Sequence, residues 1–383
     1  MKKRVLLYQQ VYLTISMTFI YRQLMGVSNK YEMLVCTNKT ENLSVFPFEK
    51  LFSMPKTFLG KITTRVFRKL NSSYVLLSKP QKNCYSNVIN EYDVELIHAH
   101  FGPGGLEVLP IAQKNKLPLL VTFHGYDASE LLKNKVYVQH LKALFAYGHI
   151  ITVSNYMKER LIGYGLDSSR CYVHYIGVPI NDFEFKQRCS LDNKVKKKDE
   201  VIFLQVSNFV EKKGHLYTIN AFEKIIKEYS NVKLIFAGDG ILRSKMESLV
   251  REKKLDEKII FVGKVVKEEV NTLMQESDIF LHHSVTSLSG DQEGIPTVLM
   301  EAMAVGLTVI STYHSGIPEL IDDGVNGFLV EEKNVEQYVE KISLALSSDN
   351  KIRENARKVI VDYFNIEKQN VHLSEIYEEV LKK

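Results

Sequence analysis

Residues 201–228 read VIFLQVSNFVEKKGHLYTINAFEKIIKE, and the fold prediction starts from this stretch. The apolar run Val201–Val206 predicts a buried β-strand, because it is short and rich in branched side chains. After a polar loop, apolar side chains recur at helical spacing and predict an amphipathic helix. They are Leu216, Ile219, Phe222, Ile225 and Ile226. A buried strand followed by such a helix is the repeating element of a parallel α/β sheet.

The same alternation runs along the whole chain in two sets. In the first half we predict strands at Arg4–Tyr8, Glu32–Cys36, Val94–His98, Leu119–Phe123, His149–Val153 and Cys171–Tyr175. In the second half we predict them at Val201–Val206, Lys233–Phe236, Ile259–Val262, Ile279–His282, Thr308–Ser311 and Gly327–Val330. Between Phe185 and Glu200 the chain is polar and has no apolar period, which is typical of a linker.

This pattern predicts an α/β protein of two Rossmann-like, doubly wound domains that face a central cleft. The length of 383 residues suits two domains of ordinary size. We expect an N-terminal domain of residues 1–190, joined by a C-terminal helix at 366–383, and a second domain of residues 191–365. Such sheets bind ligands beyond the carboxyl ends of their strands.

Charge is divided unevenly between these two parts. Residues 1–190 contain 24 Lys and Arg against 13 Asp and Glu, whereas the whole chain contains 50 against 45. From Lys50 to Asn90 there are eight basic residues and no acidic residue. Apolar side chains lie among these bases at roughly helical spacing, and they include Phe58, Leu59, Val66 and Phe67.

A basic amphipathic segment of this kind suits an anionic membrane surface, although a helix packed on its own domain with a solvated basic face fits equally well. No apolar run approaches the ~20 residues that span a bilayer. The four cysteines form neither a CxxC pair nor a zinc pattern and are typical of reduced thiols. We therefore expect a cytoplasmic protein held peripherally on the inner face of the membrane.

The most informative motif for function is GDQEGIPTVLMEAMAVG, residues 290–306. Pro296 suits the first turn of a helix, and Gly306 suits its exit. The backbone amides of Gly294 and Ile295 then lie at a helix N-terminus, which favours a phosphate group. Glu293 and Glu301 flank this site at a separation suited to the sugar and the ribose of a nucleotide-sugar. An ordinary helix with two solvated acids is the alternative.

The E-x7-E spacing of Glu293 and Glu301 resembles the donor motif of the family-four retaining glycosyltransferases, which have the two-domain GT-B fold. The surrounding sequence, with STYHSGIPE at 311–319, is similar to that of the branch of the family that builds bacterial exopolysaccharides such as colanic acid. The resemblance implies a UDP- or GDP-sugar donor as co-substrate, a glycan or lipid-linked acceptor, and no further cofactor. It also implies that Glu293 contacts the transferred sugar and Glu301 the ribose.

A second motif follows the strand Val201–Val206. Lys213 beside Gly214 is a plausible clamp for a diphosphate, and the resemblance assigns Lys213 to that position. Asn208 stands where the family usually has Arg, so one positive charge is absent from the leaving-group site. We expect the nucleobase to be read by backbone near Gly263, and the diphosphate to lie across Lys213 and residues Gly294–Pro296.

The first domain carries polar residues directly after two predicted strands. His100 and His124 follow them, with Asp127 in the same loop as His124. His124 is expected near the reacting sugar, and His100 and Asp127 on the acceptor side, as is Ser16 near the start. Met17 replaces the acid that the family usually has in the loop of Ser16.

Two absences narrow the function. No D-x-D triplet occurs, and the spacing of the histidines is not that of a zinc site, so we expect no metal. No dinucleotide fingerprint or P-loop is present, and we expect no nucleic-acid partner. The prediction is a retaining glycosyltransferase of bacterial surface polysaccharide synthesis, such as exopolysaccharide or lipopolysaccharide. The alternatives are a catalytically weak nucleotide-sugar-binding subunit and a GT-B epimerase or phosphorylase relative.

Overall fold

A computed structural model describes residues 2–14, 17–54 and 77–383 and divides the chain into two compact units. The first unit contains Met1–Gly177 and Ile366–Lys383, and the second contains Val178–Asn365. The division falls at Gly177, whereas the sequence pattern predicts it at Ser190. Val178 already belongs to the second unit because its N–H donates to the Phe364 carbonyl at 2.8 Å.

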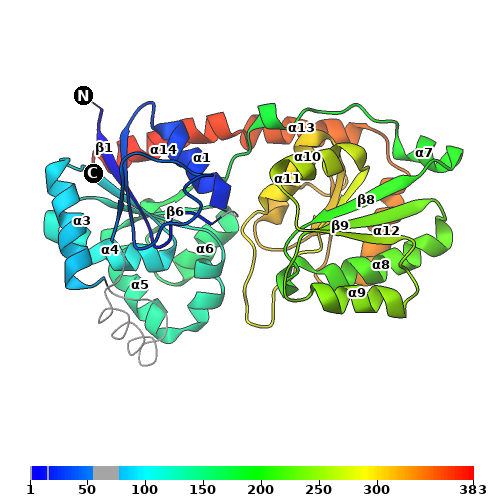
Figure 1. The fold of residues 1–383 in the computed structure, drawn as a ribbon, viewed down its shortest axis with the longest axis horizontal. Helices are drawn as coiled ribbons and strands as arrows, with labels where there is room; N and C mark the ends of the chain where they lie inside the picture. The colour runs from blue at the N-terminus through cyan, green and yellow to red at the C-terminus, as the bar shows by residue number, and fades with distance from the viewer. Residues whose placement is uncertain (1, 15–16, 55–76) are drawn as a thin grey trace. The chain divides into compact units, whose positions relative to one another are not determined.

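The first unit is built on a parallel sheet of seven strands in the order β3-β2-β1-β4-β5-β6-β7 (Figure 1). Its strands are β1 (Arg4–Gln9), β2 (Glu32–Thr37), β3 (Leu51–Ser53), β4 (Leu96–His100), β5 (Leu119–Phe123), β6 (His149–Thr152) and β7 (Cys171–Val173). The order reverses between β1 and β4, which makes this sheet doubly wound.

Helices cover both faces of this sheet because successive side chains of a buried strand point to opposite sides. Val5 and Leu7 of β1 pack with α1 (Thr18–Val27) and α14 (Ile366–Val380). Leu6 and Tyr8 of the same strand face the other core. The helices of that core are α3 (Lys79–Glu91), α4 (Gly102–Asn115), α5 (Lys135–Tyr147) and α6 (Asn155–Gly163).

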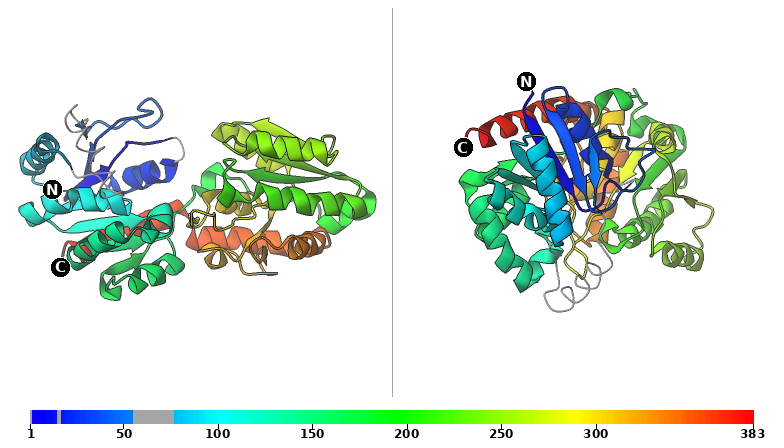
Figure 2. Two further views of the ribbon diagram at one scale, coloured as in Figure 1. Left: turned by 90° about the horizontal axis from the view of Figure 1, so that it is seen from below. Right: turned by 60° about the vertical axis from the view of Figure 1, so that its left-hand side comes forward.

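The second unit has a parallel sheet of six strands in the order β10-β9-β8-β11-β12-β13 (Figure 2). Its strands are β8 (Val201–Val206), β9 (Val232–Ala237), β10 (Ile259–Gly263), β11 (Ile279–Leu281), β12 (Thr308–Thr312) and β13 (Phe328–Val330). Its helices are α7 (Leu191–Lys197), α8 (His215–Glu228), α9 (Arg243–Glu252), α10 (Lys267–Glu276), α11 (Thr297–Val305), α12 (Val335–Leu346) and α13 (Lys351–Tyr363). The predicted class, two parallel doubly wound α/β units, is confirmed.

Two local predictions are wrong, and one strand was not predicted. The predicted strand Val94–His98 begins two residues later, since the Val94 N–H donates to the Ile89 carbonyl and closes helix α3 instead. The short edge strand β3 carries no alternation that would reveal it. The predicted linker contains helix α7, which starts because Ser190 caps it and Leu191 is buried in the core of the second unit.

Two groups of predicted residues cannot be compared with the structure. Ser16 lies outside the described residues. Most of the basic segment, including the apolar positions Phe58, Leu59, Val66 and Phe67, lies within 55–76, which is also outside them.

Candidate functional site

The loops that follow β8 and β11 form the candidate site of the second unit. These strands are neighbours at the point where the strand order reverses, so the loops after them diverge and leave room for a ligand. Each loop is tied to the other, because the Val285 N–H donates to the Lys212 carbonyl at 2.9 Å. Gly214 has a φ of +63°, and a Cβ there would lie 1.8 Å from the His283 carbonyl oxygen. Only glycine allows this approach.

Charged side chains from both loops meet at this point. The Lys213 Nζ lies 3.1 Å from Oε2 of Glu293, and the Lys212 Nζ lies 3.6 Å from its Oε1. Lys212 also pairs with Asp291 at 2.8 Å. The Glu293 and Lys213 side chains are only 12% and 15% exposed, so water screens their attraction weakly. The sequence prediction named Glu293 and Lys213 but gave Lys212 and Asp291 no role.

The two lysines determine the ionisation of Glu293. Burial alone would raise the pKa of this carboxyl, but Lys213 and Lys212 outweigh burial and lower the pKa from 4.5 to about 2. The same cluster raises the pKa of Lys212 against the effect of its own burial. Glu293 is therefore an anion, and Lys212 a cation, throughout the physiological pH range.

Helix α11 starts one residue later than predicted. Pro296 is its N-cap, and Gly306 ends it in the left-handed conformation with a φ of +89°. Glu301 lies on this helix and is partly exposed, whereas Ile295 is buried. Gly294 and Ile295 thus precede the helix instead of opening it, and a phosphate at the helix N-terminus stays a prediction.

Two further predicted residues lie at the carboxyl ends of β8 and β10, which flank β9 in the same sheet. Asn208 is exposed after β8. Gly263 ends β10 with a φ of +83°, and its carbonyl accepts from the Gly238 N–H at 2.7 Å. A Cβ on Gly263 would lie 3.1 Å from the Arg243 guanidinium. Arg243, which the sequence reasoning did not consider, therefore places a cation at these strand ends.

In the first unit, the predicted histidines are in contact with each other. The His100 Nδ1 and the His124 Nε2 are 3.0 Å apart, and the two rings stack. His100 belongs to the end of β4 and is not in the loop after it. Burial, together with nearby His98 and His174, lowers the pKa of His124 to about 3. The ring of His124 is therefore neutral at physiological pH.

Asp127 holds the loop that carries His124. Its buried carboxylate accepts hydrogen bonds from the backbone N–H groups of Gly102, His124 and Gly125 at 2.8 to 3.1 Å. Burial raises the pKa of this carboxyl, and the three N–H donors partly counter that effect. The geometry favours a role in positioning His124 over direct contact with an acceptor.

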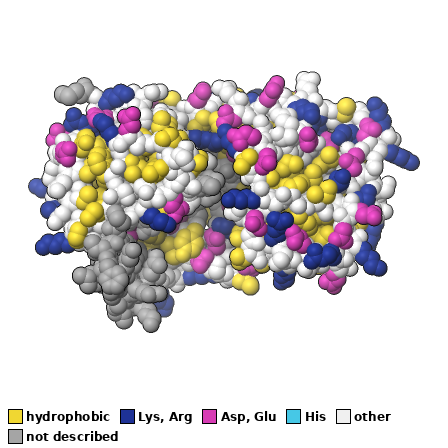
Figure 3. Space-filling model, in the orientation of Figure 1, with side chains coloured by type: hydrophobic (Ala, Val, Ile, Leu, Met, Phe, Trp, Pro, Cys, Tyr) yellow, Lys and Arg dark blue, Asp and Glu magenta, His cyan; other side chains and the backbone are white. Residues whose placement is uncertain are grey.

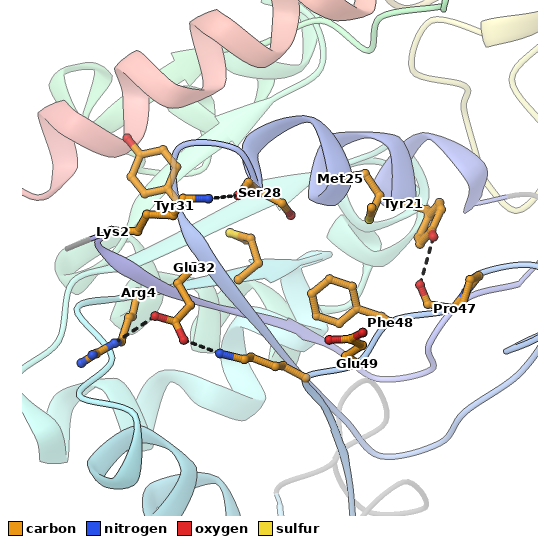
Figure 4. A pocket seen from close by; sticks show the side chains of 12 residues that line it. Lys2, Arg4, Tyr21, Met25, Ser28, Tyr31, Glu32, Pro47, Phe48 and Glu49 are labelled. Carbon is orange, nitrogen blue, oxygen red and sulfur yellow. Dashed lines mark hydrogen bonds and ion pairs between the residues drawn. The ribbon is translucent and has the colours of Figure 1, made fainter.

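A cavity of about 1030 Å³ lies elsewhere in the first unit (Figure 4). It is lined by α1, the start of β2 and residues 47–50, and Arg4, Glu32 and Lys50 form a linked set of ion pairs at its edge. Arg4 and Glu32 open β1 and β2, so this cavity is at the amino ends of the strands, opposite the predicted histidines. We do not assign it to the candidate site.

The described residues contain neither a metal-binding cluster nor a membrane-spanning helix. Among residues 2–14, 17–54 and 77–383, no cluster of His, Cys, Asp or Glu has an arrangement that could hold a metal ion. Within the same ranges, none of the helices is both long enough and apolar enough to cross a bilayer.

Two family models match the chain. The model described as Glycosyl transferases group 1 matches residues 188–359, and the model described as Glycosyltransferase Family 4 matches residues 45–182. The first model thus contains the cluster of Lys213 and Glu293, and the second contains His100 and His124.

Individual relatives agree with the family models. The chain is 28% identical over 302 residues to the putative colanic acid biosynthesis glycosyltransferase WcaL of Salmonella typhimurium, covering 77% of this chain and 73% of that protein. It is 32% identical to the amylovoran biosynthesis glycosyltransferase AmsK of Erwinia amylovora, covering 67% and 62%. It is 31% identical to the uncharacterized glycosyltransferase MJ1178 of Methanocaldococcus jannaschii, covering 77% and 78%.

The fold also matches a solved structure. Anabaena Alr3699/HepE in complex with UDP superposes with a TM-score of 0.77 at 18% identity, over 98% of this chain and 100% of that one. At this identity the match establishes the shared fold alone.

The ion-pair cluster predicts a pH-dependent contribution to stability. Because the pKa of Glu293 in the fold, about 2, lies below its ordinary value of 4.5, the charged form stabilises the fold above about pH 4.5. This contribution is lost as the pH falls towards 2. Glu293→Gln should therefore lower the free energy of unfolding by about 1–3 kcal/mol at neutral pH. This difference between variant and wild type should shrink between about pH 4.5 and 3.

Thermal unfolding of the wild type and the variant across this pH range measures the effect. Glu257→Gln removes an exposed carboxylate of the same unit and is the matched control. A cost for Glu293→Gln that is the same at every pH would contradict the ion-pair account.

Proposed function

Since this chain belongs to the group 1 and family 4 glycosyltransferases, we propose that it transfers a hexosyl group from a UDP- or GDP-sugar to a glycan or lipid-linked acceptor, with retention of configuration. The observation that carries the proposal is the cluster of Glu293, Lys212 and Lys213 at the reversal point of the second sheet. Such a reversal point is where doubly wound sheets bind nucleotides.

Lys213, Glu293 and Glu301 each have a separate role in this proposal. Lys213 binds the diphosphate, and its present pairing with Glu293 keeps its ammonium group in place before the donor arrives. Glu293, which is ionised, accepts hydrogen bonds from hydroxyl groups of the transferred sugar. Glu301, four residues after the first residue of α11, accepts hydrogen bonds from the ribose hydroxyls.

Catalysis on this account is mainly electrostatic. As the bond from the sugar to the diphosphate breaks, negative charge grows on the leaving group, and Lys213 stabilises that charge in a site with little water. The negative charge on the diphosphate also attracts Lys213 and weakens its ion pair with Glu293. The Glu293 carboxylate therefore remains available to the sugar. We further propose that His124, which is neutral, offers a hydrogen bond to a sugar without adding a charge.

The relatives suggest the pathway. WcaL and AmsK are described as enzymes of colanic acid and amylovoran biosynthesis, and the chain matches 73% and 62% of their lengths. We infer a role in the synthesis of a bacterial surface polysaccharide. The absence of Arg at Asn208 favours the alternative of a weakly active nucleotide-sugar-binding subunit, which the product analysis below distinguishes.

The proposal predicts the products and two inactive variants. Purified protein should form a new glycoside from at least one UDP- or GDP-sugar when supplied with a lipid-linked or oligosaccharide acceptor. Glu293→Ala and Glu301→Ala should each lower the rate of glycosyl transfer by about 100-fold or more, because both carboxylates bind the donor. Glu257→Ala, an exposed residue of the same unit, should keep the wild-type rate.

Mass spectrometry of the reaction separates the alternatives. An isomer of the sugar nucleotide would identify an epimerase, release of a sugar phosphate would identify a phosphorylase, and binding without product would identify a binding subunit. Wild-type rates in both glutamate variants would refute the donor-site assignment.

The basic first half motivates a second proposal, that the protein associates peripherally with an anionic membrane surface on its cytoplasmic side. Each base near such a surface contributes up to about 1 kcal/mol, and salt screens the effect within about 8–10 Å. Lys50 is already paired with Glu32, so the remaining bases of the segment Lys50–Asn90 carry the proposal. On the face of the second unit drawn in Figure 3, basic and acidic side chains are interspersed.

We predict that the protein pellets with anionic liposomes at low salt and does not pellet with neutral liposomes. Changing Lys61, Arg65, Arg68 and Lys69 together to Gln should release it. The matched control changes four exposed lysines of the second unit, Lys227, Lys245, Lys254 and Lys351, and should leave binding intact. If both quadruple variants bind equally well, the segment is an ordinary solvated surface.

A further inference from the structure

A buried histidine supports the backbone of Glu293. The ring of His314 follows β12 and is fully buried, and its Nε2 accepts the Glu293 N–H at 3.1 Å. A ring nitrogen can accept a hydrogen bond only when it carries no proton. The proton of the neutral ring must therefore be on Nδ1, which donates to Oε1 of Glu332 at 2.5 Å. Glu332 thus fixes the tautomer that the Glu293 amide requires.

Glu332 joins three strand ends. It lies just after β13, and besides His314 it accepts the Thr286 backbone N–H at 2.7 Å and the Thr286 hydroxyl at 3.1 Å. Thr286 belongs to the loop after β11 that leads to Glu293. The amide group of Gln292 donates to the same Thr286 hydroxyl at 3.0 Å. One carboxylate therefore connects the ends of β11, β12 and β13 beneath the loop that carries Glu293.

Glu293 is consequently held from two directions. Its side chain is fixed by Lys213, and its backbone N–H is fixed by His314. If the imidazole is removed, the Glu293 N–H loses its acceptor inside a largely buried loop, and the loop must move to find another. A shift of about 1 Å in a substrate-positioning group lowers rates by as much as about 100-fold.

We propose that His314 and Glu332 are positioning residues that set the Glu293 carboxylate for the transferred sugar, an inference that rests on the proposed function of Glu293. They act on Glu293 through its backbone and do not touch the donor. Their effect should therefore fall on recognition of the sugar and spare recognition of the nucleoside diphosphate, which Lys213 binds.

A second histidine of the same unit shows what a purely structural role looks like. The Nε2 of His283 accepts the Lys333 backbone N–H at 3.0 Å, which is the same type of bond, and its ring packs against Tyr217 and Tyr338. This bond anchors Lys333, the neighbour of Glu332, and leaves the acceptor of the Glu293 N–H in place. His283→Ala therefore measures what the loss of a buried imidazole does to this segment while the bond from Glu293 to His314 is kept.

The test compares binding of a sugar nucleotide with binding of the nucleoside diphosphate alone, together with steady-state kinetics. His314→Ala should lower kcat/KM about 10- to 100-fold and weaken UDP-sugar or GDP-sugar binding, while UDP or GDP affinity changes less than about twofold. His314→Gln, which keeps an acceptor near the Nε2 position, should recover most of the loss. Glu332→Gln should show a smaller loss of the same kind, whereas Glu331→Gln, an exposed neighbour, should behave like the wild type.

Several outcomes overturn the inference. Equal losses for the sugar nucleotide and the diphosphate, or no recovery in His314→Gln, would show that His314 only maintains the fold. If His314→Ala does not fold, His314→Gln and Glu332→Gln supply the comparison. Glu293→Ala is measured alongside: if it is fully active, the proposed function fails, and if it is inactive while the His314 variants are unaffected, only the positioning role fails.

Discussion

The second unit is organised around one buried carboxylate held between two lysines. Glu293 reaches this position from the loop after β11, and Lys212 and Lys213 reach it from the loop after β8. The strand order brings these loops together, because β8 and β11 are neighbours at the reversal point of the sheet. The cluster is a preorganised set of charges, and such sets stabilise charge that develops during a reaction without reorganising.

The supports of this cluster are as specific as the charges themselves. Gly214 allows the first loop to lie against the His283 carbonyl, and His314 fixes the backbone of Glu293. In the first unit, Asp127 plays a comparable part for His124, since its carboxylate binds three backbone N–H groups of the strand-end loops. In both units a buried polar side chain holds the backbone that presents the candidate functional group.

Features that depend on local sequence could be predicted. Strand β8 has its predicted bounds because its apolar run is short and flanked by polar residues, and Gly306 ends α11 as its lack of a Cβ suggests. Features that depend on distant contacts could not. The pairing of Lys212 with Asp291 and the bond from Glu293 to His314 join segments far apart in the chain. The start of β4 differs from the prediction for a local reason, because Val94 closes helix α3. The E-x7-E spacing predicts the candidate site, but it does not reveal the residues that support it.

The central claim is that Lys213 binds the diphosphate of a nucleotide-sugar. The most direct measurement is calorimetric titration of wild-type protein and Lys213→Ala with UDP and with uridine, and with GDP and guanosine. If the claim holds, the substitution weakens binding of the diphosphate by about tenfold or more and leaves binding of the nucleoside unchanged, because only the diphosphate carries the charge that the ammonium group attracts. Equal affinities of the two proteins for the diphosphate, or equal losses for diphosphate and nucleoside, would contradict it.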